Sequence, residues 1–285
     1  MKTASPLRYP GGKSAMADLL IQIRKLNGLG DRALAEPFAG GAGASLTLLY
    51  LEEVCKIYIN DADSTIYDFW WTLINRSHQF LNMLSKTSVN INEWISQREV
   101  YRSSGRISRT RRGFSVLYLN RCNRSGIIMN GGPIGGIKQT GKWKLDARFN
   151  KAEIRRRCKK VAEYSERISL SCYDGITFIE SLNPESNFFF IDPPYFEKGR
   201  TLYLNALDKD YHEALALRMK AMQDAAWVMT YDDIPDVRRL YRGWATIRPF
   251  CLRYSANKRR SGKELLITPK WMRLPANQSS AAILW

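Results

Sequence analysis

The stretch Phe188-Phe189-Phe190-Ile191-Asp192-Pro193-Pro194-Tyr195 places an acid, two prolines and a tyrosine directly behind four apolar residues. A short continuous apolar run is typical of a strand that is buried on both faces of a sheet in an α/β protein. Ligands of open α/β sheets bind beyond the carboxyl ends of the strands, where Asp192 falls. The stretch therefore predicts an α/β fold whose ligand site includes residues 192–195.

Residues 192–195 suit the methylation of a planar amine. The lone pair of an amine on a heterocycle is delocalised into the ring, so the nitrogen needs an acceptor for each N–H group before it can become tetrahedral and attack. Asp192 offers a carboxylate, and the two prolines fix φ so that the Pro193 carbonyl is held rigidly. The Tyr195 ring offers a stacking face for a base, which contributes about 1–3 kcal/mol. We predict a catalytic role for Asp192, Pro193, Pro194 and Tyr195; a merely stiff turn is the alternative.

A glycine-rich loop precedes this site in the chain. Residues 36–43 read Glu-Pro-Phe-Ala-Gly-Gly-Ala-Gly and lead into a helix-like run at 44–52. Glycines let the backbone approach a ligand closely, and a helix amino terminus favours a negatively charged group. A short strand ending at Asp61 follows about twenty residues later, the spacing expected of an acid that binds ribose hydroxyls. The glycine-rich loop and Asp61 together suit either NAD or S-adenosylmethionine as the ligand. The chemistry of residues 192–195 favours S-adenosylmethionine.

Several motifs together resemble one family over most of the chain. They comprise residues 6–13 (Pro-Leu-Arg-Tyr-Pro-Gly-Gly-Lys), 36–43, 60–61, 118–121 (Tyr-Leu-Asn-Arg), 148–151 (Arg-Phe-Asn-Lys), 174 and 192–195. In this combination the chain resembles the Dam-type DNA adenine-N6 methyltransferases of the alpha group, in which the cofactor motif precedes the catalytic motif and the recognition region lies between them. The resemblance implies a Rossmann-like class I methyltransferase fold, with a mostly parallel sheet and an inserted helical DNA-recognition subdomain.

The resemblance also implies a set of cofactor contacts. Tyr9 and Lys13 would contact S-adenosylmethionine, Asp61 would hold its ribose, and Asp174 would lie against its adenine. The full set of expected cofactor-binding residues is Tyr9, Lys13, Glu36, Pro37, Phe38, Gly40, Gly43, Asp61, Asp174 and Asp192.

Structural roles stay open for some of these residues. Residues 11–13 also suit a plain turn, and Phe38 also suits the hydrophobic core. Asp61 and Asp174 also suit the N-caps of helices that follow them directly, because Asp is a good N-cap residue.

The chain is strongly basic: 44 Lys and Arg against 27 Asp and Glu give a formal net charge of +17. Such an excess predicts phosphate contacts and a steep salt dependence of nucleic-acid binding. Much of it lies at residues 98–124, where Glu99 is the only acid and aromatic residues interleave with arginines. The expected DNA-binding residues of this block are Arg109, Arg111, Arg112, Asn120, Arg121, Asn123 and Arg124.

A second basic segment lies between apolar-bearing segments at residues 252–255 and 265–268, a pattern that predicts a hairpin. In the family that the chain resembles, a hairpin at this position contacts DNA. The expected phosphate ligands are Lys258, Arg259, Arg260 and Lys263. A solvated turn kept soluble by its charge is the alternative.

The five cysteines have no metal-ligand spacing, and the chain has only two histidines. An odd cysteine count, with no evident signal peptide and no apolar run of membrane-spanning length, suits reduced thiols in a cytoplasmic protein. The sequence therefore predicts no metal site, no membrane span and no Ser-His hydrolase chemistry.

The motifs divide the chain into two expected units. Residues 1–66 and 167–285 would form a catalytic domain that uses S-adenosylmethionine, and residues 67–166 would form the target-recognition subdomain. We predict a site-specific enzyme that methylates the N6 amine of a flipped-out adenine in double-stranded DNA. An RNA or protein-amide methyltransferase stays open as an alternative, as does a DNA-binding protein that lacks the chemistry.

Three further properties are not determined by the sequence. The recognition sequence is open, because residues 122–132 depart from the pattern associated with readers of GATC. The oligomeric state and the pairing with a separate restriction endonuclease are open as well.

Overall fold

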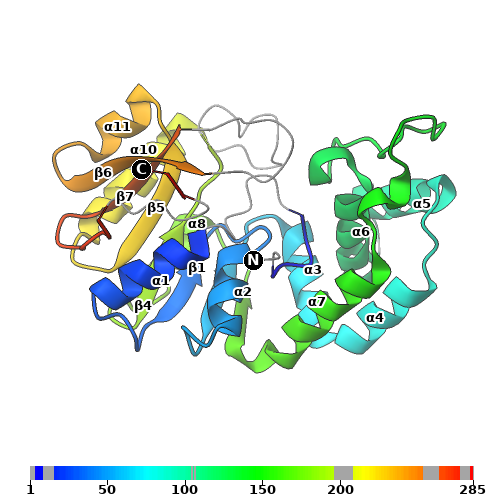
Figure 1. Ribbon diagram of the computed structural model, residues 1–285, viewed down its shortest axis with the longest axis horizontal. Helices are drawn as coiled ribbons and strands as arrows, with labels where there is room; N and C mark the ends of the chain where they lie inside the picture. The colour runs from blue at the N-terminus through cyan, green and yellow to red at the C-terminus, as the bar shows by residue number, and fades with distance from the viewer. Residues whose placement is uncertain are drawn as a thin grey trace.

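A computed structural model describes residues 4–8, 16–103, 105, 107–195, 208–252, 263–276 and 283–284. Its centre is an eight-stranded sheet with the order β3-β2-β1-β4-β5-β7-β6-β8 (Figure 1). The strands are β1 (Ala33–Glu36), β2 (Ile57–Asn60), β3 (Ile168–Ser171), β4 (Asn187–Ile191), β5 (Trp227–Asp232), β6 (Ala245–Leu252), β7 (Lys263–Pro269) and β8 (Ile283–Leu284). Strands β1 to β5 pair in parallel, whereas β7 pairs antiparallel with both β5 and β6. The prediction of a Rossmann-like α/β fold with a mostly parallel sheet is confirmed.

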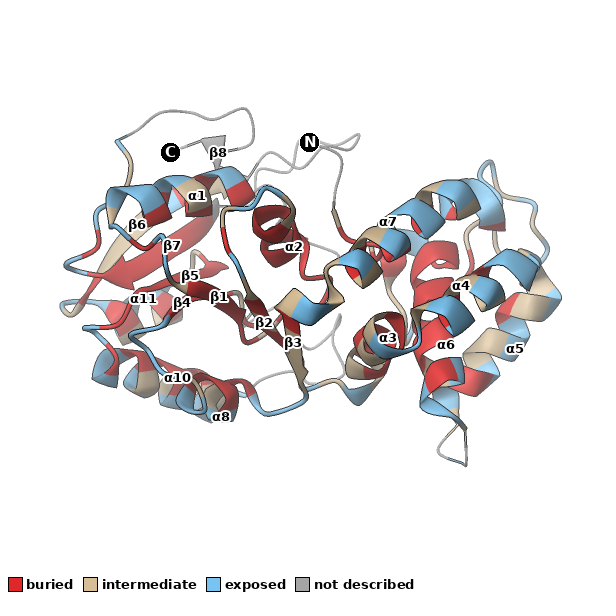
Figure 2. Cartoon of the chain, turned by 90° about the horizontal axis from the view of Figure 1, so that it is seen from below, coloured by how far each residue is buried: buried red, intermediate tan, exposed pale blue. Residues whose placement is uncertain are grey.

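Helices cover both faces of the sheet. They are α1 (Ala17–Leu26), α2 (Gly43–Tyr50), α8 (Gly175–Glu180), α10 (Lys209–Ala221) and α11 (Pro235–Tyr241). Figure 2 shows α1 and α2 on one face, with α8, α10 and α11 on the other. This layering explains why the strands are apolar on both sides.

Strand β4 shows how the sequence builds the two cores. Phe188 and Phe190 belong to the apolar cluster under α1 and α2, whereas Phe189 and Ile191 belong to the cluster under α8 and α10. Successive side chains of a strand point to opposite faces, so a run of four apolar residues serves both layers. All four side chains are buried.

The chain reverses direction in the sheet between β1 and β4. From β1 it proceeds outward through β2 to β3, and it then returns to β4 on the other side of β1. Such a switch point is where ligands bind in open α/β sheets. The loops that follow β1 and β4 both lie at this edge, and they are the glycine-rich loop and the 192–195 motif.

The helices between β2 and β3 lie beside the sheet (Figure 1). They are α3 (Ser64–Asn75), α4 (Ser77–Lys86), α5 (Ile91–Arg102), α6 (Arg109–Cys122) and α7 (Lys151–Glu163), with short 3-10 turns η2 (Arg124–Gly126), η3 (Leu145–Arg148) and η4 (Ser165–Arg167). Helix α6 lies at their centre, and its residues 113–122 are all buried. Gly113 lets α6 approach α3 closely, because a Cβ there would lie 2.4 Å from the Asp68 carbonyl oxygen. The apolar cluster on the α1 and α2 face of the sheet continues through these helices.

Strands β6 and β7 pair antiparallel, as the predicted hairpin requires. Strand β6 ends at Leu252, where the sequence pattern predicted that the first strand of the hairpin begins. The turn with Lys258, Arg259 and Arg260 lies outside the described residues, and only the backbone of Lys263 is described.

Candidate cofactor and catalytic site

Asp192 begins the loop after β4 and is half-buried. Its Oδ1 accepts a hydrogen bond of 2.6 Å from the Thr230 hydroxyl on β5. Pro193 is buried and Pro194 is half-buried, so the motif is packed against the end of the sheet. The Tyr195 ring, also half-buried, lies 6.5 Å from the ring of Tyr231, centroid to centroid.

The glycine-rich loop after β1 leads into α2 through two left-handed residues. Gly40 has φ of 46° and Ala42 has φ of 45°. Ala42 is the N-cap residue of α2, and its own side chain makes no capping hydrogen bond. The start of α2, at Gly43, therefore presents backbone amides and the positive end of the helix dipole to a ligand. Pro37 and Gly43 are buried.

Asn60 at the end of β2 ties the loops of this edge together. Its Nδ2 donates to the carbonyl oxygens of Pro37 and Tyr173, at 2.9 Å each. Its Oδ1 accepts from the Tyr173 amide and the Ser171 hydroxyl, at 2.8 Å each. Its own carbonyl oxygen accepts from the amide of Ala39 in the glycine-rich loop at 2.9 Å. The fully buried Asn60 thus fixes the loops after β1 and β3 in relation to β2.

Asp61 holds the glycine-rich loop rather than capping a helix. Its Oδ2 accepts from the Gly40 amide and its Oδ1 from the Asp63 amide, at 2.9 Å each. Asp63 caps α3, through a 2.8 Å bond from the Thr65 amide. The alternative of an N-cap role for Asp61 is therefore wrong. Burial raises the pKa of Asp61 to about 7.

Glu36 lies beneath the loop at the end of β1. The carboxyl group is buried and accepts a hydrogen bond from the Ser45 hydroxyl on α2. Burial raises the pKa of Glu36 to about 8, and the nearby Asp192 and Asp61 carboxyl groups contribute to the increase. Three acidic side chains thus converge on one edge of the sheet, an arrangement that favours a cationic ligand.

The buried Glu36 carboxyl predicts a pH-dependent stability. Its folded-state pKa of about 8 lies above the ordinary value of 4.5, so the stabilisation that is fully present below that value is lost as the pH rises towards 8. This group alone is expected to lower the free energy of unfolding by about 2 kcal/mol between roughly pH 6 and pH 8. Urea unfolding of the Glu36→Gln variant should show a correspondingly shallower pH dependence than the wild type. Parallel pH profiles of the two proteins would contradict this assignment.

Phe38 and Asp174 meet at the start of α8. Asp174 is the N-cap residue of this helix, and its Oδ1 accepts from the amides of Ile176 and Thr177 at 2.9 and 3.2 Å. The alternative cap role is therefore observed, and Asp174 remains exposed. Phe38 is partly buried and packs directly on Gly175, where a Cβ would lie 2.3 Å from the ring.

Asn120 and Asn123 are fully buried inside the helical part of the molecule. The Asn120 side chain accepts from the Arg8 amide at 2.7 Å and donates to the carbonyl oxygens of Arg8 and Gly126 at 2.8 and 3.0 Å. The Asn123 side chain accepts from the Trp94 indole at 2.7 Å. The expectation that these amides contact DNA does not fit their buried, engaged positions, since they bond to the protein itself.

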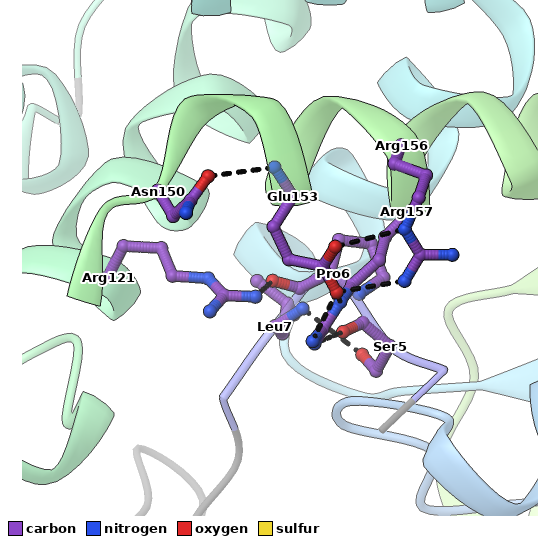
Figure 3. A network of polar contacts seen from close by, with 8 residues as sticks. All are labelled: Ser5, Pro6, Leu7, Arg121, Asn150, Glu153, Arg156 and Arg157. Carbon is purple, nitrogen blue, oxygen red and sulfur yellow. Dashed lines mark hydrogen bonds and ion pairs between the residues drawn. The ribbon is translucent and has the colours of Figure 1, made fainter. Parts of the chain in front are cut away.

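Arg121 is buried as well, and it holds the amino-terminal segment with Arg157 (Figure 3). Arg121 donates to the Pro6 carbonyl oxygen, and Arg157 of α7 donates to the Ser5 carbonyl oxygen at 2.9 Å. Burial lowers the pKa of Arg121 to about 10. The side chain thus fastens residues 5–8 to α6 instead of extending towards a phosphate.

Arg109 and Arg112 both pair with the buried Asp68 of α3. The Arg109 Nε lies 3.0 Å from Asp68 Oδ1, and Arg112 binds Oδ2. Arg109 also lies over the Trp71 ring, 4.7 Å from its centroid. These arginines therefore secure α6 against α3, although Arg109 is still exposed. Arg111 is exposed too.

A comparison with protein families identifies the relationship. The model of the D12 class N6 adenine-specific DNA methyltransferases matches residues 9–253. The chain belongs to this family of methyltransferases. No curated protein shows a significant match to the chain.

Membership of the D12 class makes the protein an adenine-specific DNA methyltransferase, so the resemblance seen in the sequence is confirmed. Among the expected site residues of this methyltransferase, Tyr9 and Lys13 lie outside the described residues. Within the described ranges, no group of three or more His, Cys, Asp or Glu side chains could hold a metal ion. No described helix has the length and apolar character needed to cross a membrane.

Three residues of the candidate site had no role assigned from the sequence. They are Ser45, which binds Glu36, Asn60, which joins the loops, and Thr230, which binds Asp192. Thr230 directly follows the apolar run at residues 227–229 of β5, and this break in the apolar pattern is the signal that sequence reasoning could have used.

Proposed function

We propose that this methyltransferase transfers the methyl group of S-adenosylmethionine to the N6 amine of an adenine that has rotated out of double-stranded DNA. The observation that most supports the proposal is that the glycine-rich loop and Asp192 follow the adjacent parallel strands β1 and β4 at the switch point of the sheet, where the Glu36 and Asp192 carboxyl groups interact. Membership of the D12 class also supports a nucleotide cofactor that binds at this edge beside a catalytic acceptor.

The residues at the switch point fit S-adenosylmethionine. The start of α2, where the N-cap residue Ala42 makes no side-chain cap, suits the carboxylate of the cofactor. The buried Glu36 lies close to Asp192, and these two acids suit the cationic groups of the cofactor. Asp61 would accept from ribose hydroxyls, and Phe38 and Asp174 would lie against the cofactor adenine. When bound, S-adenosylmethionine supplies a methyl group on a positively charged sulfur.

The side chains of residues 192–195 suit the activation of the adenine amine. The Asp192 carboxylate would accept one N–H of the amine, and the Pro193 carbonyl would accept the other. The Tyr195 ring would stack on the base, which offsets part of the few kcal/mol that rotation out of the duplex costs. The amine proton would leave by way of Asp192.

Gly175→Ala is expected to weaken cofactor binding. A methyl group at residue 175 would lie 2.3 Å from the Phe38 ring, so Phe38 must move out of its place beside the cofactor site. Overpacking of this kind costs about 1–3 kcal/mol, and we expect the dissociation constant of S-adenosylmethionine in calorimetry to rise by roughly tenfold or more. Gly30→Ala is the matched control, because a Cβ there meets nothing within 4 Å. Unchanged affinity in the Gly175 variant would contradict the placement of Phe38.

We further propose that residues 1–66 and 167–285 form the catalytic domain and that residues 67–166 form the target-recognition subdomain. Helices α4 to α7 fall within the second range, which supports the division. Arg111 and Arg124 are exposed there and are proposed as DNA contacts. The basic residues Lys258, Arg259, Arg260 and Lys263, from the chain between β6 and β7 and the first residue of β7, are proposed to contact phosphates.

The function is tested by incubating the purified protein with S-adenosylmethionine and unmethylated genomic DNA, then mapping modified bases by single-molecule sequencing. N6-methyladenine at one sequence motif is the expected result, and it would also reveal the recognition sequence. Methylation of RNA or of protein amides in a parallel panel, with DNA unmodified, would overturn the proposal. A protein that binds DNA but modifies none of these substrates would overturn it as well.

A further inference from the structure

Thr230 lies directly beside Asp192 because of the register between two neighbouring strands. Strands β4 and β5 are parallel, with Ile191 opposite Met229, so the next residues of the two strands face one another. The Thr230 hydroxyl donates to Asp192 Oδ1 at 2.6 Å. Thr230 is fully buried, whereas Asp192 is partly accessible.

This geometry sets the direction of the Asp192 carboxylate. A donor–acceptor distance of 2.6 Å is within the range of charge-assisted O–H···O⁻ bonds. A carboxylate has about four acceptor positions, and the Thr230 hydroxyl occupies one of them on Oδ1, which helps to set the direction of the group. The donor itself cannot turn away to water, because the Thr230 side chain is enclosed by the sheet and its covering helices.

The next residue of β5 supports the other end of the same motif. The Tyr231 ring packs near the Tyr195 ring, and the Tyr231 hydroxyl is hydrogen-bonded to His212 of α10. Tyr231 and His212 are both buried. Consecutive residues of β5 therefore contact the first and last residues of the 192–195 motif, so this strand is a rigid support for it.

We propose that Thr230 is a positioning residue for methyl transfer: its hydroxyl fixes the Asp192 carboxylate in the orientation that receives the substrate amine. The inference rests on the proposed function. Without the hydroxyl, the carboxylate must be ordered during the reaction, so the loss falls on the transfer step and not on binding of cofactor or DNA.

The test compares Thr230→Val, which keeps the shape of the side chain, with Thr230→Ser, which keeps the hydroxyl. A duplex carrying the motif mapped for the wild type and S-adenosylmethionine with a labelled methyl group are used in single-turnover assays. The transfer rate of Thr230→Val is expected to fall roughly ten- to a hundredfold, as for loss of a hydrogen bond to a charged group. Dissociation constants for cofactor and duplex should stay within about twofold of the wild type, and Thr230→Ser should recover most of the rate. Thr246→Val makes the same change in β6 and should leave the rate unchanged.

Each other outcome overturns the inference. A normal transfer rate in Thr230→Val would exclude a positioning role, as would an equal loss of rate in Thr230→Ser. Weakened cofactor binding or a lowered melting temperature in step with the rate would assign Thr230 to structure alone. Thr230→Val could fail to fold. In that case, a low transfer rate of Thr230→Ser, with unchanged melting temperature and affinities, would contradict a positioning role for the hydroxyl. A wild-type protein that methylates no DNA would instead overturn the proposed function, and this inference with it.

Discussion

Asp192→Ala is expected to remove methyl transfer to DNA, with a fall in the single-turnover rate of roughly 10³-fold or more. The variant loses the carboxylate that Thr230 orients, and with it the acceptor that draws the amine lone pair out of the ring. Asp192 is half-buried at the end of β4, so its replacement by alanine removes a charge at the edge of the sheet and leaves no unpaired charge in the core. The rate is measured with labelled S-adenosylmethionine, and cofactor and DNA affinities are measured separately and should change little.

Two further variants make this result specific. Asp192→Asn keeps an acceptor oxygen but loses the negative charge, so it should retain more activity than Asp192→Ala. Asp210→Ala changes an exposed acid in the first turn of α10 and should behave as the wild type. Turnover of Asp192→Ala within about tenfold of the wild type would refute a catalytic role for the carboxylate.

Asn120→Ala is expected to lower the free energy of unfolding by about 3–5 kcal/mol. The fully buried side chain makes three hydrogen bonds, to the amide and carbonyl of Arg8 and to the carbonyl of Gly126. Removing it leaves three buried backbone groups without this partner and opens a cavity, so both contributions destabilise. Urea unfolding followed by circular dichroism measures the change.

Asn130→Ala is the matched control, since Asn130 is exposed in the same part of the chain. It should alter the free energy of unfolding by no more than about 0.5 kcal/mol. A DNA-reading role for Asn120 would give the opposite pattern, with stability kept and affinity for the duplex lost. The pair of variants therefore decides between the role expected from the sequence and the role seen in the structure.

The fold could be predicted because its signals are local. The apolar run at 188–191 became β4, and the helix-like run expected at 44–52 became α2 at Gly43–Tyr50. The glycine-rich loop and the motif at 192–195 follow β1 and β4, as the rule for strand ends requires. What could not be predicted is the order of the strands beyond this edge, since β7 lies between β5 and β6 through pairing that no local pattern determines.

The helical part shows where sequence reasoning reaches its limit. Side-chain type suggested DNA contacts for Asn120 and Arg121, yet their partners are backbone groups of Pro6, Arg8 and Gly126. A basic or amide side chain suits a phosphate, a base or a buried carbonyl equally well, and only the packing decides among them. Thr230 was hidden for a related reason, because its contact with Asp192 depends on the register of two strands.

The fastening of residues 5–8 has a consequence for how this chain is made. Their partners Asn120, Arg121 and Arg157 come 112 to 152 positions later, so the segment emerges from the ribosome long before anything can hold it. Contacts of such long sequence separation form late in folding, because loop closure opposes them until the rest is in place. Residues 9–13, with Tyr9 and Lys13, follow the fastened segment directly. The cofactor contacts proposed for Tyr9 and Lys13 would therefore form only after α7 has joined the fold.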